Sequence, residues 1–478
     1  MIFDNLVNQI EYLDLKKQNE IEIKDISNNS KNVKEGDIFA AIKGNVSDGH
    51  KYIDHAIKNG AKTIVYENDI DFLDGINYIK VADSRKATSD ISNILSDYPS
   101  KKMTVVGVTG TNGKTTTSSL IYFLMKEIFG KATNVGTDGA FVNGQRTETP
   151  NTTPDIFFIN NILNESLDQD IDKVVIEASS HGLSQNRLNG IEFDYGVFTN
   201  LSTEHLDYHK TMDSYFDAKM NLFKVAKVKI ANFDDPYGKK SKEIFDDVIG
   251  YGIKEDADFV AYDIKKSERE TTFFVKDQKF IINTIADYEV YNALAAITTL
   301  SQMGVSLDTI SENLVKFKGI PSRFQYIEND LGKNIVIDFA HTPVAYDSLF
   351  KTIPNNVKTF AVFGVNGDRN EEFRRLTGNI CAKNKVFSVI TTDDNKFDTF
   401  ENITNDVIDG VKEFGGEFER IENRKEAIKW AISKANEGDY IIMLGKGEER
   451  FLKHHGNEKT YYNEYETVLE AIKEQWKF

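Results

Sequence analysis

The sequence predicts an α/β protein of about three domains, organised around a parallel sheet that carries a phosphate loop. First, the apolar run 103–108 ends in a glycine-rich turn followed by a lysine and hydroxyl residues, which is the order strand, phosphate loop, helix. Second, apolar β-branched runs alternate with helical spacings along much of the chain, as in a parallel α/β sheet. Third, 478 residues with 40% hydrophobic content are enough for about three cores.

The first hundred residues are predicted to form a small α/β unit. Strands are expected at 37–42 and 62–66, with a helix at about 52–58 between them. Polar residues flank the first of these strands, and Ser30 is one of them. Taken alone, they are better interpreted as solvated turn residues. The run 99–102 is expected to link this unit to the strand of the phosphate loop.

The phosphate loop carries the most specific chemistry. Gly110 and Gly113 allow the backbone to turn so that N–H groups and a helix N-terminus face an anion. Lys114 can reach the β- and γ-phosphates, and Thr115 can ligate a phosphate-bound Mg²⁺. Val108 stands where the strict pattern has its first glycine. An ordinary glycine-rich turn is the alternative, but the registered strand, loop and helix favour a phosphate site.

Later residues of the central segment are candidates for metal binding. The strand 172–178 places Glu177 near its carboxyl end, where ligands of this fold class bind and where a carboxylate suits Mg²⁺. The strand 196–201 opens into a stretch with two histidines, of which His205 is the first. The two histidines could equally well be metal ligands or ordinary polar residues of a loop. Lys219 falls on an expected helix, where a solvated lysine is the ordinary interpretation.

The C-terminal part alternates strand and helix again. Each predicted strand ends in a polar, charged or glycine-rich loop, and such strand ends are where small ligands dock in doubly wound sheets. The four strands are 335–338, 360–363, 386–390 and 440–444. We therefore expect a ligand site at this sheet edge.

Charge and cysteine content narrow the function classes. Lys+Arg number 58 and Asp+Glu 75, a net charge of −17, which argues against a general nucleic-acid or membrane-surface binder. The single cysteine, Cys381, excludes internal disulfides and fits a reducing compartment. The first ten residues lack a basic region followed by an apolar core, and no run of 18 apolar residues occurs. We therefore expect a cytoplasmic protein without membrane insertion.

With these motifs the chain resembles the Mur ligases, and among them the enzymes that add the third amino acid of the peptidoglycan stem peptide. The resemblance spans nearly all of the chain. Its motifs are the runs 36–44, 110–116, 151–154, 177–187, 198–209, 215–223, 338–343 and 445–447. It implies a UDP-sugar-binding domain at 1–100, a central ATPase domain at 101–321 and a Rossmann-like C-terminal domain at 322–478 that receives the amino acid.

The resemblance also implies the site residues. UDP-sugar or peptide contacts are expected at Ser30, Asn151, Thr152, Thr153, Ser179, Gln185 and Arg187. ATP contacts are expected at Gly110, Thr111, Asn112, Gly113, Lys114, Thr115, Thr116, Asn292, Arg323, Asp338 and His341. Mg²⁺ ligands are expected at Thr115, Glu177 and His205, and at Lys219 once CO₂ has carbamylated it. Amino-acid contacts are expected at Arg369, Asp394, Asn395, Asp398, Gly445 and Glu449.

The implied reaction is amide formation driven by ATP. A carboxylate of UDP-N-acetylmuramoyl-L-alanyl-D-glutamate takes the γ-phosphoryl group, and the amine of a diamino acid then attacks the acyl phosphate. We expect Lys114, Arg323 and Mg²⁺ to neutralise the charge that gathers in the transition state. Glu177, His205 and Lys219 complete the expected catalytic set, and a monomer is expected.

One departure from the family pattern bears on the amino acid. Phe397 stands where diaminopimelate-adding enzymes have an arginine that grips the distal carboxylate of diaminopimelate. The prediction is therefore L-lysine or ornithine, which lack that carboxylate. The alternative is meso-diaminopimelate with a cation supplied from a neighbouring turn, by Lys396, Arg374 or Arg375.

Two rival functions remain at this stage. A phosphate-loop ATPase used as a switch or motor would use the third domain to bind a partner. A folylpolyglutamate-type ligase is the nearest rival among enzymes, but the first hundred residues would then have no obvious role.

Overall fold

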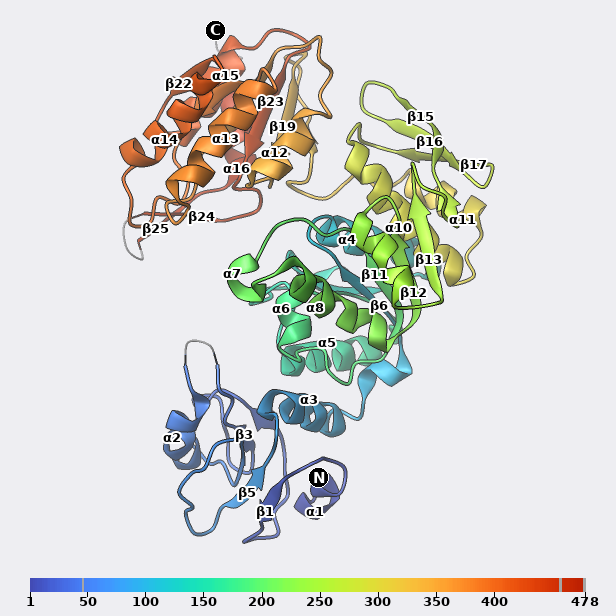
Figure 1. Ribbon diagram of the computed structural model, residues 1–478, viewed down its shortest axis with the longest axis vertical. Coiled ribbons are helices and arrows are strands. Elements are labelled where there is room, and N and C mark those ends of the chain that lie inside the picture. The colour runs from blue at the N-terminus through green and yellow to red at the C-terminus, as the bar shows by residue number, and fades with distance from the viewer. Residues whose placement is uncertain (45–46, 455–457, 476–478) are drawn as a thin grey trace. The chain divides into compact units, whose positions relative to one another are not determined.

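The computed structural model describes residues 1–44, 47–454 and 458–475 (Figure 1). Contacts among these residues divide the chain into two compact units, which are described separately. The first unit comprises residues 1–263, 274–280 and 291–314, and the second comprises 264–273, 281–290 and 315–478. In the described part of the chain the strands form sheets of five, nine, three, six and two strands.

The N-terminal sheet belongs to the first unit and has the strand order β1-β5-β4-β3-β2, parallel except for β1. Its strands are β1 (Asp14–Lys16), β2 (Ile26–Ser27), β3 (Ile38–Ala40), β4 (Thr63–Tyr66) and β5 (Asn77–Lys80). Its helices are α1 (Phe3–Val7), η1 (Gly49–Tyr52), α2 (Ile53–Lys58), α3 (Ser84–Leu95) and η2 (Pro99–Lys102). Because strand residues alternate in direction, Ile38 and Ala40 pack with α1 and α3, whereas Phe39 packs with α2.

The central sheet of the same unit positions the phosphate loop. Its order is β14-β13-β12-β11-β6-β10-β7-β8-β9, and the pairs from β14 to β7 are parallel. The strands are β6 (Thr104–Thr109), β7 (Thr133–Gly136), β8 (Gly139–Val142), β9 (Gln145–Thr147), β10 (Lys173–Glu177), β11 (Phe193–Phe198), β12 (Ala226–Asn232), β13 (Val248–Gly252) and β14 (Phe259–Val260). The helices are α4 (Lys114–Phe129), α5 (Ile156–Asp168), α6 (Ser180–Ser184), α7 (Leu206–His209), α8 (Met212–Val225), α9 (Pro236–Lys240) and η3 (Ser241–Glu243).

Apolar residues of the central strands pack against the helices that cover the sheet. Val174 and Ile176 of β10 share a core with α5 and with Leu222 of α8. Phe198 of β11 packs with Phe216 and other aromatic residues of α8. Helix α4 packs against β6, β7 and β10. These contacts hold β6 and α4 in place on either side of the loop that joins them. This loop is the first part of the candidate site.

A small three-stranded sheet follows the central sheet along the chain. Its order is β15-β16-β17. The strands are β15 (Tyr262–Lys266), β16 (Thr271–Val275) and β17 (Gln278–Ile282), and they precede α10 (Asp287–Gln302) and α11 (Leu307–Leu314). The division between the two compact units runs through these strands and through α10. The bounds of the three domains therefore stay a prediction.

The second unit contains a six-stranded sheet of order β18-β19-β23-β20-β21-β22, parallel except for β18. Its strands are β18 (Gln325–Ile327), β19 (Asn334–Asp338), β20 (Thr359–Phe363), β21 (Phe387–Ile390), β22 (Phe418–Arg420) and β23 (Tyr440–Leu444), with a separate hairpin of β24 (Phe451–Lys453) and β25 (Lys459–Tyr461). Its helices are α12 (Pro343–Phe350), α13 (Glu371–Lys383), α14 (Phe400–Glu413), α15 (Arg424–Lys434) and α16 (Glu464–Gln475).

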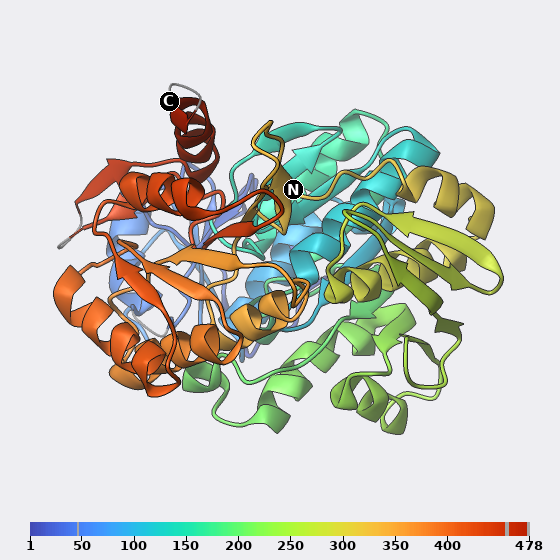
Figure 2. The ribbon, with the colours of Figure 1, turned by 90° about the horizontal axis from the view of Figure 1, so that it is seen from above.

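Helices cover both faces of this sheet (Figure 2). Val336 of β19 faces a core shared with α12, α13 and α14. Its neighbours Ile335 and Ile337 face a second core shared with α15 and α16. The alternation follows from the two-residue period of a strand. The result is a doubly wound sheet whose strand ends carry the loops expected to bind the amino acid.

The strands and helices named from the sequence are present, which confirms the α/β fold class. The strand expected at 172–178 is β10, and the helix expected after the phosphate loop is α4, which ends at Gly130 with φ +88°. The linker expected at 99–102 is the short helix η2. The sequence reasoning missed the short antiparallel strands β1, β8 and β9, which lie at or next to sheet edges.

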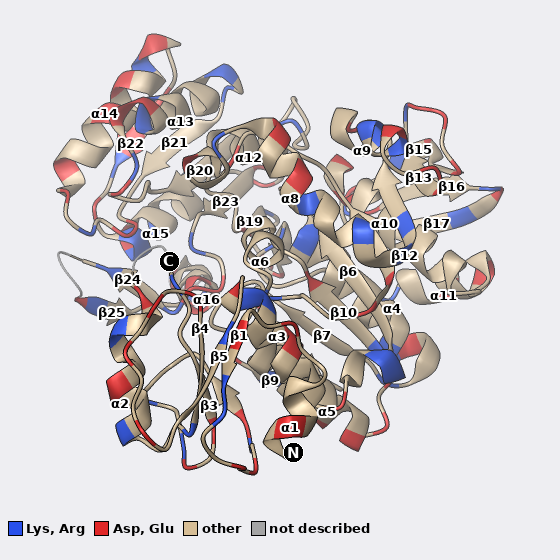
Figure 3. Cartoon of the chain, turned by 60° about the horizontal axis from the view of Figure 1, so that its bottom comes forward, with Lys and Arg blue, Asp and Glu red and all other residues tan. Residues whose placement is uncertain are grey.

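Acidic and basic residues are interspersed along the helices and loops of the described part of the chain (Figure 3). Among the residues the structure describes, the helices lack the length and apolar character that a membrane span needs.

A buried ion pair fixes α16 against the loop that follows β23. Arg424 and Glu464 are each only 1% exposed, and Arg424 Nε donates to Glu464 Oε2 at 3.0 Å. Arg424 Nη2 also donates to the carbonyl of Leu444 at 2.8 Å. The guanidinium therefore holds the last residue of β23 in place, immediately before Gly445.

Replacement of Arg424 by methionine is expected to destabilise the second unit by about 3–5 kcal/mol, because the Glu464 carboxylate would stay buried without its cation. Urea unfolding followed by the fluorescence of Trp430, which lies on α15, measures the change. The matched control is Arg420→Met, since Arg420 is exposed and donates to Asn405. Equal unfolding midpoints for Arg424→Met and wild type would contradict this account of the ion pair.

Candidate active site

The phosphate loop joins β6 to α4 and has the backbone that its glycines permit. Gly110 has φ +152° and Gly113 has φ +81°. A Cβ at Gly110 would lie 1.8 Å from Thr199 Oγ1, and one at Gly113 would lie 2.5 Å from Asn292 Oδ1. Neither position has room for a side chain, and Gly113 also needs the left-handed conformation. Helix α4 starts at Lys114, so its unpaired N–H groups belong to this loop.

Residues after β11 hold the loop in this shape. The carbonyl of Asn200 accepts from Thr111 N at 2.8 Å, and Asn200 Oδ1 accepts from Asn112 N at 2.9 Å. Thr199 Oγ1 donates to the carbonyl of Asn112 at 2.7 Å. The sequence reasoning missed these residues as site residues, although they lie in the predicted strand 196–201, shortly before the two histidines.

Glu177, at the end of β10, meets the first turn of α4. Its Oε2 accepts from Thr115 Oγ1 at 3.1 Å, and its Oε1 accepts from Thr137 N at 2.9 Å. Gly136 makes this approach possible, because a Cβ there would lie 2.1 Å from Glu177 Oε1. Burial raises the pKa of Glu177, opposed by the N–H of Thr137 and the charge of Lys114. Thr137 was not predicted, and its place directly after β7 is the signal that could have found it.

Two lysines converge on the phosphate loop. Lys114 Nζ donates to the carbonyls of Gly110 at 3.0 Å and Thr111 at 2.8 Å. Lys219 of α8 is 1% exposed and donates to the same Gly110 carbonyl at 2.6 Å. Its Nζ lies 4.5 Å from the ring centroid of Tyr215. Burial and the Lys114 charge lower the pKa of Lys219 well below its ordinary value. Lys219 is therefore buried beside the phosphate loop, where its surroundings favour the neutral amine, and it is not a solvated helix lysine.

His205 belongs to a cluster of rings on the same side of the loop. Its ring centroid is 5.0 Å from that of His181 and 6.2 Å from that of Tyr215. Burial lowers the pKa of His205, so its imidazole is available as a neutral ligand. His209 stacks on Tyr215 and shares a hydrogen bond of 3.0 Å with Ser180 Oγ. Burial lowers the pKa of His209 to about 4.

The residues expected to contact the UDP sugar or peptide form a hydrogen-bonded network around α6. Thr153 Oγ1 lies 3.0 Å from Ser179 Oγ, which caps α6 by accepting from Gly182 N. Arg187 donates to the carbonyl of Thr153 at 2.8 Å and to Gln185 Oε1 at 2.8 Å. Thr152 connects this network to the expected metal region, because its Oγ1 is 3.0 Å from Thr137 Oγ1. Asn151, the preceding residue, is exposed. Ser30 is buried in the N-terminal part of the chain, with its Oγ 3.0 Å from His55 Nδ1.

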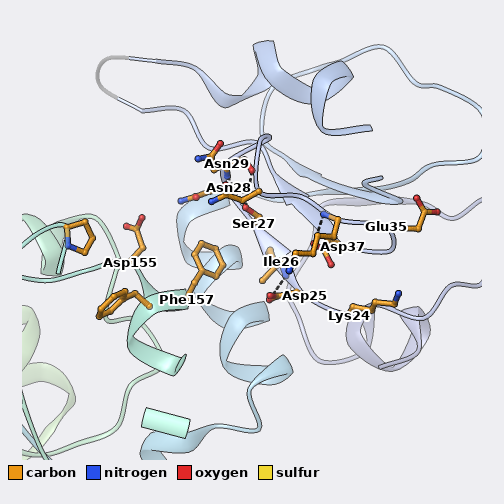
Figure 4. Close-up of a pocket in the computed structure, with 14 residues that line it drawn as sticks. Lys24, Asp25, Ile26, Ser27, Asn28, Asn29, Glu35, Asp37, Asp155 and Phe157 are labelled. Carbon is orange, nitrogen blue, oxygen red and sulfur yellow. Dashed lines mark hydrogen bonds between the residues drawn. The ribbon is translucent and has the colours of Figure 1, made fainter. Parts of the chain in front are cut away.

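A pocket of about 740 Å³ lies between the N-terminal sheet and the start of α5 (Figure 4). Its lining includes Asn29 and Pro150, the chain neighbours of Ser30 and Asn151. Phe157 supplies an apolar wall, and Lys24 and Lys34 share the lining with four carboxylates, those of Asp25, Glu35, Asp37 and Asp155. Its volume is within the range of small-molecule sites. Space for a ligand thus exists next to the segments expected to hold the UDP sugar.

The residues expected around the nucleotide are divided between the two units. In the first unit, Asn292 Oδ1 accepts from Thr117 Oγ1 at 3.2 Å, beside Thr116 in the first turn of α4. In the second unit, Asp338 accepts from Phe324 N at 2.6 Å and from Ala340 N at 2.7 Å. The remaining two flank Phe339: the Arg323 guanidinium carbon lies 4.7 Å from the Phe339 ring centroid, and His341 Nδ1 lies 2.9 Å from the Phe339 carbonyl.

Most residues expected to bind the amino acid lie at the carboxyl edge of the six-stranded sheet. Asp394 and Glu449 share the buried Lys446, whose Nζ donates to Asp394 Oδ1 at 2.8 Å and to Glu449 Oε2 at 2.6 Å. Gly445 leads into Lys446 with φ +100°. Lys446 was not predicted as a site residue, although it is the middle residue of the 445–447 motif.

The other expected amino-acid contacts lie on nearby turns. Asn395 follows Asp394, and its carbonyl would be 1.9 Å from a Cβ at Gly367. The Arg369 guanidinium carbon lies 4.7 Å from the Phe373 ring centroid. Asp398, which we expected to be open to a substrate ammonium, is paired with Arg374 at 2.7 Å. The structure therefore places Asp398 in an ion pair of the protein itself.

The oxygen atoms near the phosphate loop fit Mg²⁺. Thr115 Oγ1 and Glu177 Oε2 lie 3.1 Å apart beside a loop shaped for phosphate, and Mg²⁺ is commonly held by one or two protein oxygens together with phosphates and waters. Among residues 1–44, 47–454 and 458–475, no group of three or more His, Cys, Asp or Glu could hold a metal without such outside ligands.

Comparison with known proteins supplies the observation that decides the family. A protein of Clostridium botulinum named UDP-N-acetylmuramoyl-L-alanyl-D-glutamate--2,6-diaminopimelate ligase is 34% identical over 472 residues, covering 96% of this chain and 97% of the relative. The chain belongs to the Mur ligase family. The Mur ligase family catalytic domain matches residues 22–93, the middle domain 108–300, and the glutamate ligase domain 322–447.

Other Mur ligases agree with this membership. A protein of Clostridium acetobutylicum with the same 2,6-diaminopimelate ligase name is 35% identical over 463 residues, covering 95% of each chain. A solved structure of a 2,6-diaminopimelate ligase has 29% identity and a TM-score of 0.70, covering 95% of each chain. A MurF ligase from Thermotoga maritima, solved in complex with ADP, matches in fold with 22% identity and a TM-score of 0.62, covering 95% of this chain and 98% of the other.

Family membership confirms several expectations from the sequence. The chain has the three-domain α/β architecture of the Mur ligases, and it is an ATP-dependent ligase of peptidoglycan synthesis. The preference for L-lysine or ornithine is not supported, because the similar Mur ligases are named for 2,6-diaminopimelate. The alternative drawn from the sequence is thus the favoured one.

Proposed function

We propose that this Mur ligase joins 2,6-diaminopimelate to UDP-N-acetylmuramoyl-L-alanyl-D-glutamate in an ATP-driven reaction. The observation that carries the proposal is the match to ligases of that name along almost the whole chain. The convergence of Lys114, Glu177 and Lys219 on one phosphate loop supports it.

The first chemical step of the proposal is phosphoryl transfer. A carboxylate oxygen of the UDP-muramoyl dipeptide attacks the γ-phosphorus of ATP, the bond to ADP breaks, and an acyl phosphate forms. Two anions must approach each other for this attack. The N–H groups of the glycine-rich loop and the Lys114 ammonium bind the phosphates and offset that repulsion.

Thr115, Glu177 and His205 are the proposed protein ligands for Mg²⁺ near the phosphates. When bound, Mg²⁺ would neutralise charge on the transferred phosphoryl group. Lys219 is the proposed further ligand after carbamylation. Its neutral buried amine can attack CO₂, lose a proton and become an anionic carbamate, whereas an ammonium cannot ligate a cation.

The second step is attack by the amine of the amino acid on the acyl carbonyl. The resulting tetrahedral intermediate expels phosphate and leaves an amide. The proposed role of Asp394, Glu449 and Lys446 is to bind the far end of the amino acid, so that its reacting amine is fixed in position.

The expected result for the amino acid is a preference of tenfold or more for meso-diaminopimelate over lysine and ornithine, equivalent to about 1.4 kcal/mol. The measurement is kcat/KM from ADP release, with the same UDP-muramoyl dipeptide and each amino acid in turn. A tenfold preference for lysine or ornithine would contradict the proposal and restore the interpretation drawn from Phe397.

A further inference from the structure

Lys453 brings a second cation to the carboxylate that Lys446 already binds. Its Nζ lies 2.9 Å from Asp394 Oδ2, and its backbone N donates to Asp394 Oδ1 at 3.0 Å. Asp394 is 2% exposed, whereas the side chain of Lys453 is 38% exposed. Burial would raise the pKa of Asp394, but the hydrogen bonds and charge of Lys446, joined by those of Lys453, hold it below its ordinary value.

The two lysines differ in what they can offer a ligand. Lys446 is fully buried and is held by Asp394 and by Glu449. Lys453 ends β24, and its backbone is fixed because its carbonyl also accepts from Lys396 N at 3.3 Å. Its side chain reaches solvent from this fixed position. Lys453 can therefore turn its ammonium from Asp394 to an incoming anion without any movement of the main chain.

The cations proposed from the sequence to replace an arginine at position 397 are engaged in ion pairs away from Asp394. Arg374 binds Asp398 at 2.7 Å and Asp406 at 3.1 Å. Lys396 is paired with Asp368. Phe397 is 74% exposed and carries no charge. Arg375 Nε lies 3.0 Å from Glu413 Oε2, so all three cations proposed from the sequence as substitutes for an arginine at position 397 are paired with other carboxylates.

The chemistry of the substrate fits an ion pair that can open. The far end of diaminopimelate carries an ammonium and a carboxylate on one carbon. Placed between Asp394 and Lys453, its ammonium would bind Asp394 and its carboxylate would bind Lys453, so that both protein charges remain paired. The far end of lysine has an ammonium alone. It would take Asp394 and leave Lys453 as a like charge beside it, which opposes binding.

We propose that Lys453 is a specificity-determining residue, which accepts the distal carboxylate of diaminopimelate in place of an arginine at position 397. This inference rests on the proposed function and deepens it. It assigns the recognition of the substrate to the hairpin β24–β25 rather than to the loop that follows β21.

The test compares Lys453→Met with wild type in the full-length enzyme, with ATP, Mg²⁺ and the UDP-muramoyl dipeptide. For meso-diaminopimelate, kcat/KM is expected to fall about a hundredfold, mainly through KM. For L-lysine, kcat/KM is expected to stay the same or rise. Lys453→Arg keeps the cation and should retain most of the activity with diaminopimelate. Lys459→Met, on the opposite strand of the same hairpin, is the matched control and should behave as wild type.

The proposal is supported if Lys453→Met loses the preference for diaminopimelate over lysine and Lys453→Arg retains it. If wild type prefers diaminopimelate and Lys453→Met keeps that preference within twofold, the role of Lys453 is overturned while the proposed function stands. Equal losses with diaminopimelate and lysine also overturn it, because they indicate general damage to the site. If wild type itself prefers lysine tenfold or more, both the proposed function and this inference fail.

Discussion

Lys114→Ala is expected to abolish ATP turnover, with kcat lowered by roughly a thousandfold or more. Lys114 starts α4, and its Nζ lies over the carbonyls of the phosphate loop, where it can reach the terminal phosphates. Without it, the approach of the substrate carboxylate to ATP lacks a positive charge. The measurement is ADP release at saturating UDP-muramoyl dipeptide and amino acid.

The same variant should still bind the UDP-muramoyl dipeptide with unchanged affinity in calorimetry. The residues expected to hold that substrate, such as Ser179 and Arg187, are hydrogen-bonded to Thr153 and Gln185 around α6, whereas Lys114 donates to the carbonyls of the phosphate loop. Lys126→Ala, near the other end of α4, is the matched control and should keep its turnover. If Lys114→Ala lost affinity for the UDP-muramoyl dipeptide as strongly as it loses ATP turnover, the two sites would not be separate.

Lys219→Ala is expected to be nearly inactive and to regain part of its activity with acetate or propionate. The proposed carbamate places an anionic oxygen beside the phosphate loop, and a short carboxylic acid can enter the space left by the truncated side chain. The buried position of Lys219 and its lowered pKa supply the neutral amine that carbamylation needs. The measurement is ADP release with and without the added acid.

Two controls accompany the Lys219 experiment. Lys224→Ala changes a lysine on the same helix whose Nζ binds Asn221 near the surface, and it should be fully active without rescue. Lys219→Arg introduces a guanidinium that stays charged and cannot form a carbamate, and this variant should be inactive. A fully active Lys219→Ala enzyme would refute the role of this residue.

The parts of the site that follow from local pattern could be predicted from the sequence. The phosphate loop needs Gly110 and Gly113 because neighbouring atoms occupy the space of a Cβ, and this requirement is visible as spacing. Glu177 was found because the carboxyl end of a buried strand is a fixed place in a parallel sheet. The fold class followed for the same reason, since strand and helix periodicities are local properties.

The parts that depend on contacts between distant segments could not be predicted. Thr137 meets Glu177 across 40 residues of sequence. Lys453 meets Asp394 across 59 residues, from a hairpin whose strands have three residues each. Lys219 has the spacing of an ordinary helix lysine, and only its burial against the Gly110 carbonyl separates it from a solvated one. The preference for lysine or ornithine drawn from Phe397 is not supported by the names of the similar ligases, and the absence of an arginine at one position says nothing of cations brought in by another loop.

The transfer of oxygen from substrate to phosphate tests the central claim most directly. UDP-N-acetylmuramoyl-L-alanyl-D-glutamate labelled with ¹⁸O in its glutamate carboxylates is incubated with enzyme, ATP, Mg²⁺ and diaminopimelate, and the released phosphate is analysed by mass spectrometry. The acyl phosphate route predicts one ¹⁸O atom in each phosphate, because the carboxylate oxygen that attacks ATP leaves with the phosphoryl group. Unlabelled phosphate, formed with or without the amino acid, would show that water attacks ATP and would contradict the ligase mechanism in favour of an ATPase.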